Sequence, residues 1–279
     1  MGIYAVTGGS HGIGAKTVEL LKKEGHEVIN IDLLKGDITA DLVTLEGRQK
    51  VIDELHALHP EGLDGLILSA AVSGACGSLT KIISLNYFGA VSVIKGTYDL
   101  LEKRHGSCVA VSSNIISQDI SRMDIADLLN NNGDDEHKIR SLVSSLDASD
   151  LSIGNSIYAA SKYALARWVR RHSASYAANG VRINAVAPGN VGSAMTATMS
   201  HSARASLNAL PIPTRYGQET FMDPKEIALA IVFLASEKAC GINGIVMFVD
   251  GGTDALLNTE KVYYRRTDGC CQLKNTLMR

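Results

Sequence analysis

The feature that most constrains the fold is a regular alternation of short apolar runs with longer amphipathic segments. Apolar runs with strand character occupy residues 2–8, 26–33, 62–70, 107–113, 181–189 and 244–252, and helical patterns occupy residues 12–24, 45–58, 80–104, 158–178 and 225–236. Runs that are apolar throughout are typical of strands buried on both faces of a sheet. Strand and helix in turn indicate parallel strands. We therefore expect an α/β protein with one doubly wound parallel sheet and helices on both faces.

Two long segments interrupt the alternation. Residues 114–157 separate a strand from its helix, and residues 193–222 form a second long connection rich in methionine and leucine. Connections of this length in a compact domain are usually functional or disordered. We expect one catalytic domain over residues 1–255, with an insert at 114–157 and a substrate loop at 193–222. A C-terminal tail of little pattern follows at 256–279. Within the insert, MDIADLL and HKIRSLVSSL have helical patterns.

Composition excludes several classes of partner. The chain has 279 residues and a net charge of −2, which gives no electrostatic reason to expect nucleic acid or an anionic membrane. No apolar run approaches the ~20 residues of a membrane span, and a leader peptide is not evident at the N-terminus. The 5 cysteines lack metal-ligand spacing, so we expect no metal site and the reduced thiols of a cytoplasmic protein. The acidic run 134–136 is interpreted as a solvated loop.

A glycine-rich loop, TGGSHGIG, connects the first strand to the first helix at residues 7–14. Glycines allow the backbone to turn tightly and to approach a ligand without a Cβ in the way. The free N–H groups and the dipole of the helix N-terminus favour an anion. The strand before the loop and the helix after it fit a site for the pyrophosphate of a dinucleotide.

Asp32 ends the second strand. A carboxylate there can accept hydrogen bonds from the ribose hydroxyls of NAD and would repel the additional phosphate of NADP. Leu33 and Leu34 follow, so no arginine is present to receive that phosphate. The alternative is a solvated aspartate at a strand end. We expect NAD as the cofactor and consider NADP the less favoured one.

A tyrosine and a lysine, Tyr158 and Lys162, are separated by one helical turn in YAASK. Positions four apart lie on the same face of a helix. A free phenol is poorly ionised at neutral pH, and a nearby positive charge lowers its pKa. The pair is therefore suited to act as a tuned proton donor and acceptor.

TGGSHGIG and YAASK, in this order, resemble the glycine and YxxxK motifs of the short-chain dehydrogenase/reductase family. The resemblance covers residues 2–255 and includes SLNYFGA, VAVSS, PGNVGS and VDGG. It implies a Rossmann-type fold, a nicotinamide cofactor, and oxidation of alcohols or reduction of carbonyls. Within the family the chain is most similar to the 3α-hydroxysteroid dehydrogenase/carbonyl reductase group, with coniferyl alcohol dehydrogenases nearby. IDLLKGDITADL, NYFGA and the long insert before YAASK carry this similarity.

The resemblance also implies roles for individual residues. Ser113 would hydrogen-bond the substrate oxygen, Asn86 would keep a water in line for a proton relay, and Lys162 would hold the nicotinamide ribose. The catalytic set is thus Asn86, Ser113, Tyr158 and Lys162. The cofactor-binding set is Gly8, Ser10, His11, Gly12, Ile13, Gly14, Asp32, Leu33, Asp41, Leu42, Ser69, Ala70, Ala71, Tyr158, Lys162, Pro188, Gly189, Val191 and Ser193.

The chain departs from the family pattern after its fourth strand. Where the family usually has Asn-Asn-Ala-Gly, this chain has Ser69-Ala70-Ala71-Val72, so the backbone there must be held in another way. The insert between Ser113 and Tyr158 is also longer than most relatives have.

The expected function is NAD-dependent interconversion of a secondary alcohol and a ketone. The substrate is expected to be small, apolar and cyclic: a hydroxysteroid, a terpenoid or an aryl alcohol. A 3-oxoacyl thioester reductase is an alternative, and a nucleotide-sensing regulator without turnover is a further one. Many relatives are oligomeric, and we expect a homo-oligomer, most simply a dimer.

Overall fold

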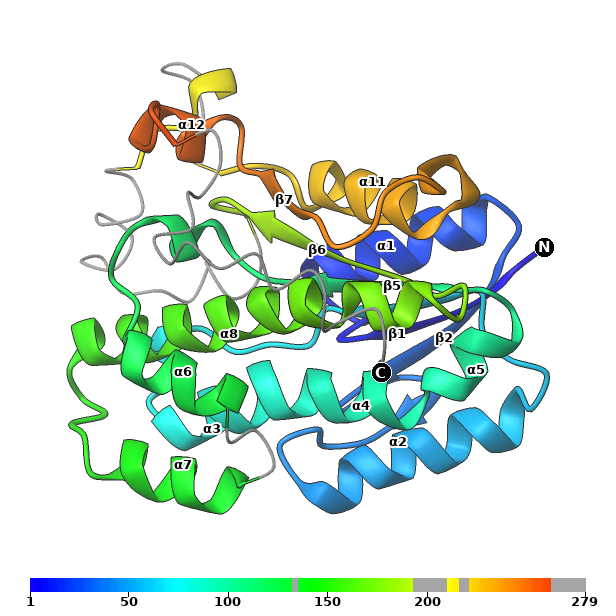
Figure 1. The fold of residues 1–279 in the computed structure, drawn as a ribbon, viewed down its shortest axis with the longest axis horizontal. Helices are drawn as coiled ribbons and strands as arrows, with labels where there is room; N and C mark the ends of the chain where they lie inside the picture. Colours follow the sequence, from blue (N-terminus) through cyan, green and yellow to red (C-terminus); the bar gives the residue numbers. More distant parts are fainter. Residues whose placement is uncertain (132–134, 193–209, 216–220, 262–279) are drawn as a thin grey trace.

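Parallel strands form one sheet at the centre of the structure (Figure 1). The structure is a computed structural model and describes residues 1–131, 135–192, 210–215 and 221–261. In these residues the sheet has 7 strands in the order β3-β2-β1-β4-β5-β6-β7, all parallel, so the predicted doubly wound sheet is confirmed. The strands are β1 (Ile3–Thr7), β2 (Glu27–Asp32), β3 (Ile38–Thr39), β4 (Gly65–Leu68), β5 (Ser107–Val111), β6 (Arg182–Pro188) and β7 (Val246–Val249). The two-residue β3 is too short to give a periodic pattern in the sequence.

Helices cover both faces of the sheet, as predicted (Figure 1). Helices α1 and α11 lie on one face, and α2, α4 and α8 lie on the other. The helices are α1 (Gly12–Lys23), α2 (Leu45–Leu58), α3 (Leu79–Ile83), α4 (Ala90–Gly96), α5 (Tyr98–Lys103), α6 (Met123–Asn131), α7 (Glu136–Ser144), α8 (Leu151–Ala177), α11 (Pro224–Ala235) and α12 (Thr253–Leu257).

Alternate residues of each strand supply two hydrophobic cores. Val6 of β1 and Ile67 of β4 belong to the core under α1 and α11. Ala5 and Leu66, their neighbours in the chain, belong to the core under α2, α4 and α8. Successive side chains of a strand point to opposite faces of the sheet. Both faces are buried, which is why these strands are apolar at nearly every position.

The strand order reverses between β1 and β4. The chain builds outward from β1 to β2 and β3, and then returns to add β4 on the other side of β1. Ligands of open α/β sheets bind at such a reversal, outside the carboxyl ends of the strands. Thr7 and Leu68, the last residues of β1 and β4, are register partners at this point.

The segment predicted as one helix over residues 80–104 is broken. A π-helical turn over Ser84–Gly89 joins α3 to α4, and α5 starts after Thr97. The Thr97 hydroxyl donates to the carbonyl of Val93 (2.8 Å), which is the local side-chain bond that competes with helical geometry. A π-turn adds a single residue to one turn, so the apolar spacing hardly reveals it.

The insert contributes more regular structure than its sequence suggests. Helix α8 begins at Leu151, where Asp150 caps it by accepting from the N–H of Ser152 (2.7 Å). The two helical patterns of the insert are α6 and α7. The interpretation of the acidic run as a solvated loop is wrong for Glu136, which is the first residue of α7 and whose side chain is 16% exposed, whereas Asp135 is exposed and caps α7 from the preceding loop. Asp134 lies outside the described residues.

Two negative findings apply to the described residues alone. None of their helices combines the length and apolar character needed to span a membrane. No group of three or more of their His, Cys, Asp or Glu side chains is placed to hold a metal ion.

Candidate active site

A cavity of about 630 Å³ opens at the carboxyl ends of the strands. Most of the predicted site residues line it: Gly8, His11, Gly12, Ile13, Asp32, Leu33, Asp41, Leu42, Ser69, Ala70, Ala71, Ser113, Tyr158, Lys162, Pro188, Gly189 and Val191. The topology therefore brings together residues that are far apart in the sequence. Ser10, Gly14 and Asn86 do not line the cavity, and Ser193 lies outside the described residues.

The glycine loop has the backbone conformation that a dinucleotide site requires. Gly8 and Gly12 have positive φ angles of 69° and 52°. A Cβ on Gly8 would lie 2.8 Å from Cα of Ala70, and a Cβ on Gly14 would lie 2.1 Å from the carbonyl oxygen of Gly8. No other residue type fits at these positions, so the loop can pass close to β4 and present the N-terminus of α1 to an anion. This cradle fits the pyrophosphate of a nicotinamide dinucleotide.

The carboxylate of Asp32 is fixed at the end of β2. It accepts from the backbone N–H of Ser10 (3.1 Å) and from that of Leu33 (2.8 Å). Ser10, predicted as a cofactor contact, thus binds the Asp32 carboxylate through its backbone N–H, and its hydroxyl donates to the carbonyl of Lys35. At the next turn of the cavity wall, Asp41 accepts from the N–H of Val43 (2.9 Å).

The backbone after β4 is held by two side chains. The buried hydroxyl oxygen of Thr7 accepts from the N–H groups of Ser69 (3.1 Å) and Ala70 (3.2 Å). The amide of Asn86 accepts from the N–H of Val72 (2.9 Å) and donates to its carbonyl (2.9 Å). This chain lacks the Asn-Asn-Ala-Gly that its family usually has after the fourth strand, and these bonds hold the backbone there instead. Thr7 was missed by sequence reasoning; a polar residue closing an apolar strand was the available signal.

Asn86 lies in the π-turn and is almost fully buried. Its side-chain nitrogen also lies 3.4 Å from the Ser161 hydroxyl, to which it donates. Both ends of the amide are thus committed to protein groups. The predicted water relay would therefore have to use the main chain of Asn86 rather than its side chain. Inserted π-turns are frequent at functional sites.

Tyr158, Ser113 and Lys162 meet where α8 passes the end of β5. The phenol of Tyr158 is hydrogen-bonded to Ser113, whose hydroxyl also accepts from the N–H of Ile115 (3.3 Å). The ammonium of Lys162 lies 5.9 Å from the centre of the Tyr158 ring and donates to the carbonyl of Val111 (2.8 Å). The helical spacing therefore stacks the pair on one face, as predicted.

Burial dominates the electrostatics of this pair. It raises the pKa of Tyr158, and the hydrogen bond with Ser113 lowers that pKa by less. It also lowers the pKa of Lys162 to about 7. The lysine is therefore only partly charged at neutral pH, and the protein groups around Tyr158 do not produce the lowered phenol pKa predicted from the sequence. The phenol is kept protonated and can donate a proton.

The cavity is also lined by aliphatic and polar residues from the loop after β4, the first part of the insert and the start of α8: Val72, Ser73, Gly74, Ile115, Gln118, Ile120 and Asn155. Of the predicted substrate loop, Leu210 lines the cavity, while residues 193–209 and 216–220 lie outside the described residues.

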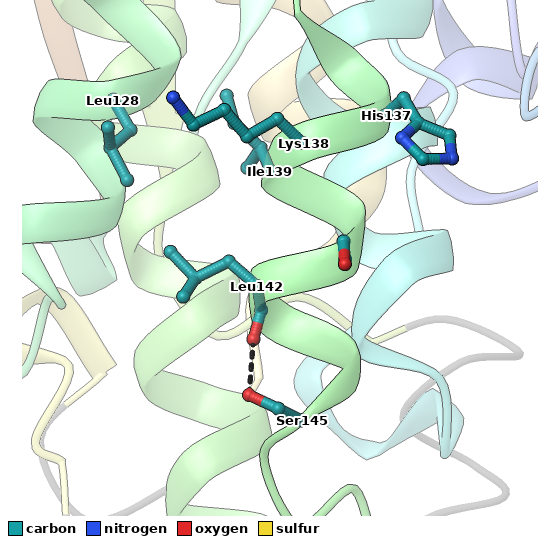
Figure 2. A pocket seen from close by; sticks show the side chains of 7 residues that line it. Leu128, His137, Lys138, Ile139, Leu142 and Ser145 are labelled. Carbon is teal, nitrogen blue, oxygen red and sulfur yellow. Dashed lines mark hydrogen bonds between the residues drawn. The ribbon is translucent and has the colours of Figure 1, made fainter.

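A second hollow of about 580 Å³ lies on the insert (Figure 2). It is formed between α6 and α7 and is lined by Leu128, His137, Lys138, Ile139, Ser141, Leu142 and Ser145. None of these residues belongs to the predicted site. The hydroxyl of Ser145 donates locally to the carbonyl of Leu142 (2.7 Å). The chemistry therefore belongs to the first cavity.

Comparison with known proteins agrees with the motifs. A family model described as enoyl-(acyl carrier protein) reductase matches residues 139–254. The chain is 31% identical over 257 residues to the 3-alpha-hydroxysteroid dehydrogenase/carbonyl reductase of Comamonas testosteroni, covering 92% of this chain and 98% of that protein. It is 27% identical to the cis-4-hydroxycyclohexanecarboxylate dehydrogenase of Sinomonas cyclohexanicum, covering 91% and 97%.

A solved structure shares the fold over the same extent. The crystal structure of the 3-alpha-hydroxysteroid dehydrogenase from Pseudomonas sp. B-0831, complexed with NADH, matches with a TM-score of 0.83 and 32% identity. It covers 92% of this chain and 99% of that one. The resemblance inferred from the sequence, including the group that the chain is most similar to, is thus confirmed. The chain belongs to the short-chain dehydrogenase/reductase family of nicotinamide-dependent oxidoreductases.

Proposed function

We propose that this protein is an NAD-dependent dehydrogenase that interconverts a secondary alcohol and a ketone on an apolar, cyclic substrate. The observation that supports this most is that Tyr158, hydrogen-bonded to Ser113, lines the same cavity as Asp32 and the glycine loop. A dinucleotide bound along the glycine loop supplies the hydride acceptor or donor and, when oxidised, a positive charge near the phenol. The cofactor and catalytic sets predicted from the sequence are proposed with the adjustments described for Ser10 and Asn86.

The proton chemistry is assigned to Tyr158. In reduction its phenol donates a proton to the carbonyl oxygen as that oxygen becomes an alkoxide. In oxidation the phenolate takes the proton of the alcohol. The Ser113 hydroxyl holds the same substrate oxygen beside the phenol. Lys162 donates a hydrogen bond to the carbonyl of Val111, and its ammonium, when protonated, stabilises the phenolate of Tyr158.

The preference for NAD is proposed on the setting of Asp32. Two backbone N–H groups fix its carboxylate, so it can accept from ribose hydroxyls without rearrangement. Leu33, which follows it at the cavity wall, offers no charge to compensate a 2′-phosphate. A second negative group there would be repelled.

The substrate class is proposed from the walls of the cavity. The cavity is lined by aliphatic side chains from Val72, Ile115, Ile120 and Leu210, while polar groups come from Ser73, Gln118 and Asn155. Such walls suit a hydrophobic ring that carries one hydroxyl or ketone. The names of two relatives, a hydroxysteroid and a hydroxycyclohexanecarboxylate dehydrogenase, support a cyclic alcohol.

A cofactor-reduction assay tests the proposal. Purified protein is given NAD or NADP with hydroxysteroids, monocyclic terpenols, aryl alcohols and 3-hydroxyacyl thioesters, and the absorbance of reduced nicotinamide is followed. NAD-linked turnover of a cyclic alcohol is the expected result. Turnover of the thioesters alone would favour a 3-oxoacyl thioester reductase. Cofactor binding without turnover on any class would favour a nucleotide-sensing regulator.

A further inference from the structure

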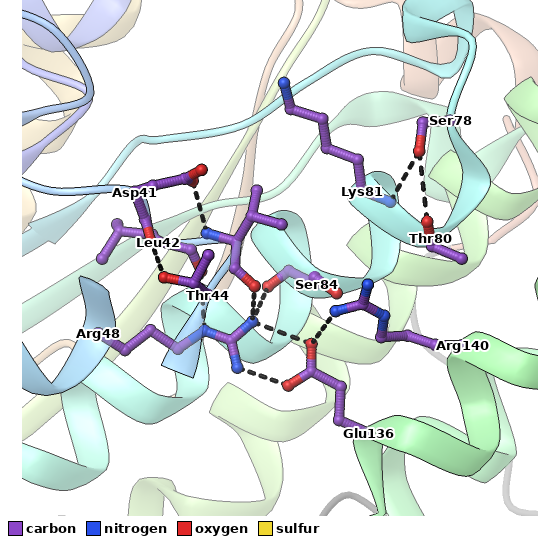
Figure 3. Close-up of polar contacts among 11 residues, drawn as sticks. Asp41, Leu42, Thr44, Arg48, Ser78, Thr80, Lys81, Ser84, Glu136 and Arg140 are labelled. Atoms are coloured by element: carbon purple, nitrogen blue, oxygen red, sulfur yellow. Dashed lines mark hydrogen bonds and ion pairs between the residues drawn. The ribbon is translucent and has the colours of Figure 1, made fainter. Parts of the chain in front are cut away.

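An arginine of α2, Arg48, is buried behind the cavity wall (Figure 3). Its guanidinium donates to the carbonyls of Leu42 (2.7 Å) and Val43 (3.0 Å), and to the carbonyl of Ser84 (2.8 Å). Leu42 and Val43 line the cavity, whereas Arg48 itself does not. Ser84 opens the π-turn that carries Asn86. One side chain therefore fixes two segments of the wall from outside the cavity.

The charge of this arginine is balanced by the insert. Glu136, the first residue of α7, accepts from Nη1 (2.6 Å) and Nη2 (3.0 Å) of Arg48, 88 positions away in the chain. The side chain of Arg48 is 2% exposed and that of Glu136 is 16% exposed. Removing one partner of a buried pair leaves the other charge uncompensated, which is costly. The position of the Arg48 guanidinium therefore depends on α7, which carries Glu136.

The same insert contacts the π-turn at a second point, Tyr87. The phenol of Tyr87 donates to the carbonyl of Leu129 in α6 (2.7 Å). Helix α6 is in turn fixed to α8 by the ion pair between Asp127 and Arg167 (2.7 Å). The two insert helices thus hold the π-turn from two directions. Only the α7 contact, through Arg48, also reaches Leu42 and Val43.

We infer that Glu136 is a positioning residue for the adenosine half of the dinucleotide. Acting through Arg48, it sets the main chain of Asp41–Val43, which lines the cavity. The inference rests on the proposed cofactor role of that wall. It gives the insert a function at the cofactor, in addition to its walls at the substrate end. The partners of Tyr158, Ser113 and Lys162 in the described residues include neither Arg48 nor Glu136, so proton transfer at Tyr158 does not use the pair directly.

Binding of ADP-ribose to the ligand-free protein tests the inference, with calorimetry as the readout. Glu136→Ala should weaken ADP-ribose by about tenfold, since displacing one wall of a site costs on the order of 1.4 kcal/mol. Glu136→Gln, which keeps an acceptor for Arg48, should recover part of the affinity. In assays, KM for NAD should rise while kcat at saturating NAD stays unchanged.

Two matched controls lie on the same insert. Arg140→Ala removes only a 4.0 Å contact to Glu136 from a side chain that is 44% exposed, and should leave ADP-ribose affinity unchanged. Asp127→Ala removes the ion pair between α6 and α8 without touching Arg48 or Glu136, and should also leave the affinity unchanged. Equal losses in Glu136→Ala and Asp127→Ala would overturn the inference, because they would indicate general loosening of the insert. Wild-type affinity in Glu136→Ala would overturn it as well.

Amide hydrogen exchange separates the inference from the proposed function. In the ligand-free protein, Glu136→Ala should speed exchange of the Val43 and Thr44 amides, which bond to Asp41. If wild-type protein fails to bind ADP-ribose, the proposed cofactor role fails. Unchanged amide exchange in Glu136→Ala would separately refute the inference that Glu136 holds the main chain of Asp41–Val43 through Arg48. Should Glu136→Ala fold poorly, the double variant Arg48→Met with Glu136→Met removes both charges together. It should fold and show the same loss of ADP-ribose affinity.

Discussion

The side-chain amide of Asn86 pairs with the main-chain N–H and C=O of Val72. Its oxygen accepts from the N–H and its nitrogen donates to the carbonyl, each over 2.9 Å. The pair joins the π-turn to the loop after β4, which lines the cavity. A residue predicted for a proton relay is therefore also a structural support of the cofactor wall.

Asn86→Asp is expected to weaken this support. The carboxylate still accepts from Val72 N–H but faces the Val72 carbonyl with an oxygen, so a buried acceptor loses its donor. We expect a loss of about 2 kcal/mol in the free energy of unfolding, measured by urea denaturation, and weaker NAD binding. Ser161→Ala removes the 3.4 Å contact with Asn86 and a local bond to the carbonyl of Tyr158 (2.7 Å) but leaves both Val72 bonds in place, and it serves as the control. Equal stability of Asn86→Asp and wild type would contradict the assigned role.

Tyr158→Phe is expected to lower kcat at least about 10²-fold, because the group that moves the proton is lost. NAD affinity, measured by fluorescence titration, should stay close to that of wild type. Tyr163→Phe, on the same helix and away from the cavity lining, is the matched control. In wild type the pKa of Tyr158 is raised by burial, so alcohol oxidation should accelerate as pH increases. Full activity in Tyr158→Phe would refute the mechanism.

Asp32→Asn is expected to shift cofactor preference towards NADP. The amide keeps an acceptor but removes the charge that repels the 2′-phosphate, so the ratio of kcat/KM for NAD over NADP should fall about tenfold or more. Asp37→Asn is the control, since Asp37 is in the adjacent turn and accepts from the N–H of Asn30 (2.8 Å). An unchanged ratio would show that Asp32 does not read the ribose.

Much of the fold was predictable because burial on both faces of a parallel sheet leaves a direct mark on composition. Helix α2 was predicted with the observed bounds, residues 45–58, and the long strands were found to within a few residues. The breaks in 80–104 were not, because a π-turn and the Thr97 bond depend on neighbouring groups and not on periodicity.

The site was predictable where spacing along one element fixes geometry, as for Tyr158 and Lys162. It was less so where distant segments meet. Thr7, which holds the loop after β4, is marked only as a polar residue that closes an apolar strand. Arg48, which meets Glu136 across 88 positions, carries no local signal. The effect of burial on the pKa of Lys162 also requires the packed structure, because sequence shows the charge but not the loss of its water.

That burial gives a prediction about stability and pH. The pKa of Lys162 is about 7 in the folded protein and 10.5 in an unfolded chain. Between these values the unfolded state binds more protons, so the contribution of this group to stability rises with pH over that range. Below about pH 7 both states are protonated and the cost of burying the charge is fully present.

Lys162→Met should therefore raise Tm, relative to wild type, more at pH 6 than at pH 9. Methionine fills similar volume without a charge to bury, and the loss of the bond to the Val111 carbonyl acts at both pH values, so it cancels in the comparison. Scanning calorimetry of both proteins at the two pH values gives the difference, expected to be about 2 °C for each kcal/mol of burial cost relieved. The same shift at pH 6 and pH 9 would mean that Lys162 keeps its proton when folded. The positive charge beside Tyr158 would then be permanent, and the phenol would need no bound cofactor to be tuned towards the pH at which the enzyme works.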